Sequence, residues 1–179
     1  MALFEAEISI ELREILLKDR PKALYKISSK GTVPVLQINS ETIIDESLDI
    51  MIWVINKSKI NWLEHEKTKQ LEMIRVNDTD FKYWLDRYKY SDRYPNKTHE
   101  EYQKKCGEFL SSYNSILKSK IYLFGEQYQL VDIALFPFIR QCAHINSNWF
   151  ENNFKNLNTW LNKIKLSSLF LSIMNKYNI

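Results

Sequence analysis

The spacing of hydrophobic residues changes about one third of the way along the chain. In the first part, apolar and polar residues alternate over 8–13, and β-branched residues stand at 33, 35 and 42–44. Both patterns are typical of β-strands. Beyond residue 61, apolar residues recur every three or four positions, which is the spacing of amphipathic helices. The pattern therefore predicts an α/β domain over 1–56 and an all-α domain over 62–179, in a chain that is mostly helical.

The first domain is predicted to contain a strand, a helix, two strands and a second helix. The segment 8–13 forms the first strand, and a short helix starts at Pro21, because proline is favoured in the first turn of a helix. This helix joins the strand at 8–13 to the strand at 33–38, so the two strands are expected to run parallel with a right-handed crossover. The next two strands, over 33–38 and 42–44, are joined by a tight turn at 39–40.

A helix is predicted to begin directly after this hairpin. Asp45 is a good N-cap residue, and Leu48, Met51, Ile52 and Ile55 follow on one helical face. That apolar face is expected to pack against the sheet.

Pro34 stands between Val33 and Val35 at the head of a predicted strand. Its bond to Val33 could be cis, since a cis bond before proline costs only about 0.5–1 kcal/mol, or it could be a trans bond on an edge strand. Because proline has no N–H, it interrupts an ordinary ladder and leaves backbone beside Val33 open to an extended peptide.

The second domain is predicted to consist of helices alone. The fourth of them contains Pro137, which should bend it, and starts with Gln129 as N-cap and Asp132 three positions later. The predicted helices cover 63–74, 79–89, 100–117, 131–145, 157–166 and 169–176.

Composition narrows the possible functions. The net charge is +3, which is too small to argue for nucleic-acid binding, and the three glycines exclude a glycine-rich phosphate loop. No apolar run reaches the length of a membrane span. The stretch 81–94 mixes aromatic and basic residues, but its apolar residues have helical spacing, which indicates an amphipathic helix rather than a nucleic-acid surface.

No metal site is predicted. Cys106 and Cys142 lie far apart in the sequence and fall on apolar helix faces, so we expect inert core thiols in a reduced, cytoplasmic compartment. His65, His99 and His144 have no ligand spacing.

Three motifs together resemble the glutathione S-transferase family. They are VPVL at 33–36, DES at 45–47 and LVDIALFPFIRQ at 130–141. The likeness covers nearly the whole chain and is greatest to bacterial cysteine-type members, and the ESLDI element at 46–50 is also similar to two-domain glutaredoxins. The resemblance implies a thioredoxin-like first domain that binds glutathione and a helical second domain.

The resemblance also assigns roles to five residues. The backbone of Val33, held by Pro34, would pair with the cysteinyl part of glutathione. Glu46 and Ser47 would take the γ-glutamyl ammonium and carboxylate, and Lys30 the glycyl carboxylate. Ordinary structural roles remain open as well: Lys30 as a solvated side chain, and Ser47 as a helix-capping residue.

The same resemblance implies that the thioredoxin-like domain is truncated. The family's first strand and most of its first helix, with the residue that contacts the glutathione sulfur, have no counterpart after Met1. We therefore expect no catalytic residue within these 179 residues, and either a start that lies upstream or a chain that is a remnant.

Three functions follow from the resemblance. The first is a transferase that passes glutathione to, or removes it from, a small hydrophobic electrophile or a disulfide; glutathione is then a co-substrate, and a homodimer is the family expectation. The second is a glutaredoxin-like thiol oxidoreductase. The third is a non-catalytic interaction module. Nucleic acid, membrane and metal are not expected as partners.

Overall fold

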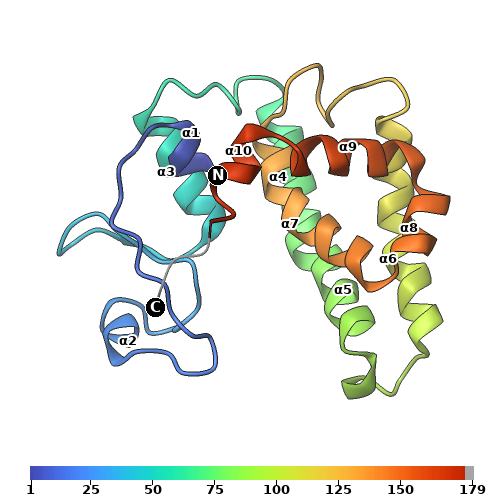
Figure 1. Cartoon of the computed structure of the whole chain (residues 1–179), viewed down its shortest axis with the longest axis horizontal. Coiled ribbons are helices and arrows are strands. Elements are labelled where there is room, and N and C mark those ends of the chain that lie inside the picture. Colours follow the sequence, from blue (N-terminus) through green and yellow to red (C-terminus); the bar gives the residue numbers. More distant parts are fainter. Residues whose placement is uncertain (176–179) are drawn as a thin grey trace. The chain divides into compact units, whose positions relative to one another are not determined.

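The computed structural model describes residues 1–175, and these divide into two compact units (Figure 1). The first unit consists of Met1–Asn61 together with the segment that begins at Ser168, and the second is Trp62–Ser167. The domain limits 1–56 and 62–179 stay a prediction.

The first unit combines short helices with one hairpin. Helix α1 packs against α3, and the buried apolar residues include Ala2 on α1 with Ile50 and Val54 on α3. The predicted helix at 21–27 and the helix after the hairpin are both confirmed. The elements are α1 (Ala2–Glu5), α2 (Lys22–Ile27), β1 (Leu36–Gln37), β2 (Ile43–Ile44), α3 (Ser47–Lys57) and α10 (Ser168–Ser172).

The hairpin is antiparallel, with Leu36 paired to Ile44 and Gln37 to Ile43. It closes through a longer turn than the two residues predicted, since the N–H of Ile38 bonds the carbonyl of Thr42 at 3.0 Å. The side chain of Asn39 holds this turn, because its Oδ1 accepts hydrogen bonds from the N–H groups of Glu41 at 2.9 Å and Thr42 at 2.7 Å. An asparagine that bonds backbone groups two and three residues on is a common turn device.

The strand predicted over 8–13 is wrong. The segment forms no ladder with another described segment, and Ile10 and Leu12 are 46% and 54% exposed. Among residues 1–175, the only sheet is the two-stranded pair β1–β2. Alternating residues form a strand only where a neighbouring backbone supplies hydrogen bonds, and none of the described segments does so here.

The second unit is helical, as predicted. The first two predicted helices form a continuous run in which a π-helical turn, η1, separates α4 from α5, and α8 was not predicted. The elements are α4 (Lys67–Val76), η1 (Asn77–Phe81), α5 (Lys82–Lys89), η2 (Ser91–Arg93), α6 (His99–Ile116), α7 (Leu130–Ile145), α8 (Ser147–Asn153) and α9 (Lys155–Lys165). The predicted helix 169–176 corresponds to α10, and residue 176 lies outside the described residues.

Helix α7 forms the centre of the second unit, and every residue from Leu130 to Phe136 is buried. Its first turn is tied to the rest of the unit by a buried glutamine. Gln70 on α4 accepts a hydrogen bond from the N–H of Val131 at 3.2 Å and donates one to the carbonyl of His65 at 2.7 Å. Pro137 lies within this helix, as the sequence requires.

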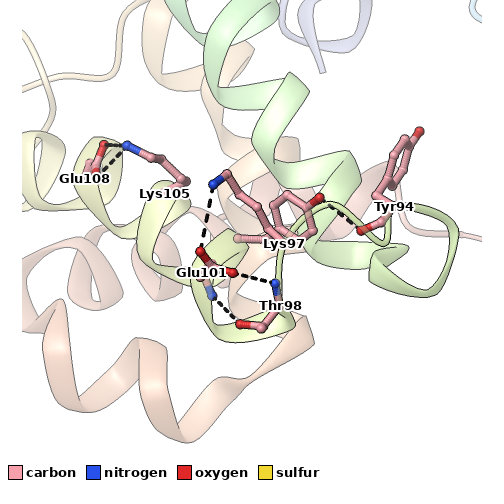
Figure 2. Close-up of polar contacts among 7 residues, drawn as sticks. Tyr94, Lys97, Thr98, Glu101, Lys105 and Glu108 are labelled. Atoms are coloured by element: carbon pink, nitrogen blue, oxygen red, sulfur yellow. Dashed lines mark hydrogen bonds and ion pairs between the residues drawn. The ribbon is translucent and has the colours of Figure 1, made fainter.

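Helix α6 begins at a reciprocal pair of hydrogen bonds, shown in Figure 2. Thr98 Oγ1 accepts from the N–H of Glu101 at 3.2 Å, and Glu101 Oε2 accepts from the N–H of Thr98 at 2.8 Å. Glu101 also lies 3.8 Å from Lys97 Nζ (Figure 2). The Tyr102 hydroxyl donates to the carbonyl of Tyr94 at 3.0 Å. This arrangement satisfies N–H groups that the first turn of a helix leaves free.

Candidate functional site

The five predicted site residues all lie in the first unit, on three neighbouring segments. Lys30 is in the turn after α2, Val33 and Pro34 lead into β1, and Glu46 and Ser47 begin α3. Leu36 pairs with Ile44, so Pro34 and Glu46, each two residues beyond this pair, lie at the same end of the hairpin.

Contacts of Lys30 join the turn to the start of α3. Lys30 Nζ lies 2.5 Å from Glu46 Oε1 and 3.1 Å from Asp45 Oδ1. The Lys30 pKa is raised, first by its hydrogen bond to Glu46 and then by the one to Asp45. The Lys30 side chain is 49% exposed, so it remains in contact with solvent while it pairs with both carboxylates.

Asp45 does not cap α3, contrary to the sequence prediction. The N-cap residue is Glu46, and no side chain caps the helix. The Asp45 carboxylate instead turns back to α2, where Oδ2 accepts a hydrogen bond from the Ser28 hydroxyl at 2.8 Å. The pKa of Asp45 is lowered, mainly by this hydrogen bond from Ser28 and next by the one from Lys30.

The N-terminus of α3 presents free backbone donors. The first N–H to be bonded within the helix is that of Ile50, which donates to the carbonyl of Glu46 at 3.0 Å. The N–H groups of Ser47, Leu48 and Asp49 precede it, and within residues 1–175 no side chain caps them. Such an end of a helix, here 11 residues long, is favourable for a carboxylate.

The backbone before β1 is also open. The Val33–Pro34 peptide bond is cis, which excludes the trans alternative, and Val33 is 46% exposed. No described residue bonds the backbone of Val33, and β1 has β2 on one side and no described strand on the other. An extended peptide could therefore pair with this edge.

Two further residues shape the turn that carries Lys30. Gly31 has φ +60, a backbone conformation that favours glycine, and a Cβ there would displace the ring of Tyr25. Ser28 is 5% exposed and closes the turn through its carbonyl, which accepts from the N–H of Gly31 at 3.1 Å. Ser28 carries no local sequence signal, because its contact with Asp45 spans 17 residues.

The aromatic and basic stretch 81–94 is an amphipathic element, as the apolar spacing predicted. Phe81, Leu85 and Tyr88 are buried. On the outer side, the Arg87 guanidinium lies 3.3 Å from the centre of the Tyr83 ring and 4.6 Å from that of Tyr94. The rings and cations therefore contact one another.

Cys106 and Cys142 are both buried in the second unit. Contact with Cys106 and burial raise the pKa of the Cys142 thiol, which keeps it protonated. In the part of the chain that the structure describes, no three His, Cys, Asp or Glu side chains gather as metal ligands, and no helix has the length and hydropathy of a membrane span.

Comparison with protein families identifies both units. The family description "Glutathione S-transferase, N-terminal domain" matches residues 1–61, and "Glutathione S-transferase, C-terminal domain" matches residues 62–165. The chain belongs to the glutathione S-transferase family. Its fold is accordingly a thioredoxin-like N-terminal domain followed by a helical C-terminal domain, mostly helical overall.

Solved glutathione S-transferase structures have the same fold. A Gtt2-class enzyme of Vibrio parahaemolyticus is 22% identical, with 96% of this chain and 88% of that chain covered and a TM-score of 0.74. A glutathione transferase of Populus trichocarpa is 17% identical over 98% and 92%, with a TM-score of 0.79. One from Phanerochaete chrysosporium, in complex with oxidized glutathione, is 15% identical over 96% and 86%, with a TM-score of 0.78. A comparison with curated proteins gave no significant match.

Proposed function

We propose that this glutathione S-transferase family member binds glutathione in the first unit, with Lys30, Val33, Pro34, Glu46 and Ser47 as its binding residues. The bound tripeptide is then transferred to, or removed from, an electrophilic or disulfide co-substrate. The observation that carries the proposal is the convergence of an open backbone edge at Val33 with the uncapped N-terminus of α3.

Each part of this site suits one part of a short peptide thiol. The edge beside Val33 offers backbone hydrogen bonds to an extended peptide, and free N–H groups of α3 offer donors to a carboxylate. The Glu46 carboxylate is 59% exposed and can neutralise an ammonium group. A peptide with both charges and a thiol in its middle, such as glutathione, uses all three features.

The chemistry at the sulfur requires a group outside these five residues. A glutathione thiol becomes a nucleophile when a donor or a helix N-terminus lowers its pKa. Cys106 and Cys142 are buried in the second unit, so neither serves as a redox partner in the folded protein. The assignment of a catalytic residue therefore stays open, and thiol–disulfide exchange of the glutaredoxin kind and a purely binding module are the alternatives.

Calorimetry with glutathione tests the binding step. Wild-type protein should release or absorb heat on titration to millimolar glutathione, Glu46→Gln and Ser47→Ala should weaken binding by about 10-fold each, and Glu41→Gln in the exposed hairpin turn should not. The absence of any heat from folded wild-type protein would contradict the proposal.

Two activity assays then separate the alternatives. Conjugation of glutathione to an aromatic halide indicates a transferase, and reduction of a glutathione mixed disulfide indicates an oxidoreductase. Binding without either reaction indicates a module. The proposal also includes a homodimer and a cytoplasmic location, which rest on family membership and on the reduced thiols expected there.

A further inference from the structure

The ion-pair cluster at the start of α3 carries one excess negative charge. The single ammonium of Lys30 contacts two carboxylates, at 2.5 Å for Glu46 and 3.1 Å for Asp45. No other lysine or arginine among the described residues pairs with either carboxylate. The cluster can therefore accept one more cationic group without becoming positive.

Asp45 anchors Lys30 within this cluster. Its Oδ2 is held by the hydroxyl of the buried residue Ser28 at 2.8 Å, which leaves Oδ1 directed to Lys30 Nζ. The Asp45 side chain is 29% exposed, against 59% for Glu46. Asp45 is thus the fixed partner of Lys30, and Glu46 is the one that a ligand can reach.

The pair formed by Lys30 and Glu46 has a charge pattern that matches one kind of chemical group. It presents a positive and a negative charge side by side, 2.5 Å apart. An α-amino acid head also presents an ammonium and a carboxylate side by side, on one carbon. When the two pairs align head to tail, every charge lies next to an opposite one. A lone carboxylate would instead approach a cluster whose net charge is negative.

We propose that Lys30 binds the γ-glutamyl α-carboxylate of glutathione beside Glu46, and not the glycyl carboxylate, with Asp45 and Ser28 as positioning residues. This inference rests on the proposed function. In an extended tripeptide the two carboxylates are about 10 Å apart. Lys30 Nζ contacts Glu46, which holds the γ-glutamyl ammonium in this proposal, so Lys30 lies at the γ-glutamyl end of the ligand. The glycyl carboxylate at the other end is then out of its reach.

A cycle of variants and ligands tests the assignment by calorimetry. The ligands are glutathione and its glycyl ethyl ester, in which the glycyl carboxylate is neutralised. Lys30→Met should weaken the binding of both ligands by the same factor of about 10-fold or more, Lys30→Arg should restore most of it, and Lys26→Met on the exposed side of α2 should change neither. If Lys30→Met weakens glutathione alone and leaves the ester unaffected, Lys30 contacts the glycyl carboxylate and the inference is overturned.

A second cycle tests the positioning role of Asp45. Asp45→Asn keeps the shape of the side chain. It should weaken the binding of both ligands by one common factor, smaller than that of Lys30→Met, because Lys30 loses its fixed partner. In the Lys30→Met background the same change should have no further effect, whereas additive losses would show that Asp45 acts only on local structure. Wild-type protein that gives no heat with glutathione overturns the proposed function itself, and this inference with it.

Discussion

Trp160 and Asp132 join α9 to the start of α7 through a buried hydrogen bond. The indole Nε1 of Trp160 donates to Asp132 Oδ1 at 2.8 Å, and both residues are almost completely buried. The same carboxylate accepts from the N–H of Leu123 at 3.0 Å and, through Oδ2, from that of Gln129 at 2.9 Å. One side chain thus satisfies three buried donors from three parts of the second unit.

Removal of this carboxylate should destabilise the protein strongly. Asp132→Ala leaves three buried N–H donors without an acceptor, and each costs about 1–3 kcal/mol. We expect the free energy of unfolding to fall by at least about 3 kcal/mol in urea titrations. Asp92→Ala, at an exposed position in η2, is the matched control and should change it by less than about 0.5 kcal/mol. A loss of the same small size for both variants would contradict the role of Asp132.

The ionisation of Asp132 should make stability depend on pH. Burial raises its pKa from 3.8 to about 6, and this outweighs the three N–H donors, which act in the opposite direction. Since the folded state holds the proton more tightly than the unfolded state, the contribution of this group is present below pH 3.8 and is lost as the pH rises to about 6. A shift of this size corresponds to about 3 kcal/mol.

Asp132→Asn isolates this effect, because it cannot titrate. Between pH 4 and pH 7 the wild type should lose about 2 kcal/mol of unfolding free energy relative to Asp132→Asn, because at pH 4 the unfolded state is already partly ionised. A difference that stays constant over this range would show that the carboxyl ionises with its ordinary pKa.

Elements with local signals could be predicted from the sequence. Helix α3 follows from an apolar face with a spacing of three and four, and α7 follows from its start at Gln129 and its continuous apolar run. Of the residues proposed to bind glutathione, Val33, Pro34, Glu46 and Ser47 stand in the family motifs VPVL and DES. The contact between Lys30 and Glu46 and the β1–β2 pairing bring their segments together.

Features that depend on distant residues could not be predicted. The segment 8–13 has the alternation of a strand but no described partner, and periodicity says nothing about a partner. Asp45 looked like a helix cap because its competing partners, Ser28 and Lys30, lie 17 and 15 residues away. Helix α8 has seven residues, too few to show a helical period.

The capping pair at the start of α6 should contribute measurably to stability. Thr98→Ala removes the acceptor for the N–H of Glu101 and should lower the free energy of unfolding by about 1 kcal/mol in urea titrations. Thr98→Ser keeps the hydroxyl and is the control, with an expected loss below about 0.5 kcal/mol. Equal losses for both variants would show that the methyl group, and not the hydrogen bond, is responsible.

The two cysteines should be unreactive in the folded protein. Cys106 and Cys142 are both 0% exposed, and the raised pKa of the Cys142 thiol, caused by contact with Cys106 and by burial, disfavours the reactive thiolate. An aromatic disulfide reagent should therefore titrate no thiol in native buffer and both thiols in guanidinium chloride. Ser111→Cys places a thiol on the exposed face of α6 as a control and should react at once with one equivalent. Rapid reaction of the native wild type would instead mean that the folded protein opens readily around Cys106 and Cys142.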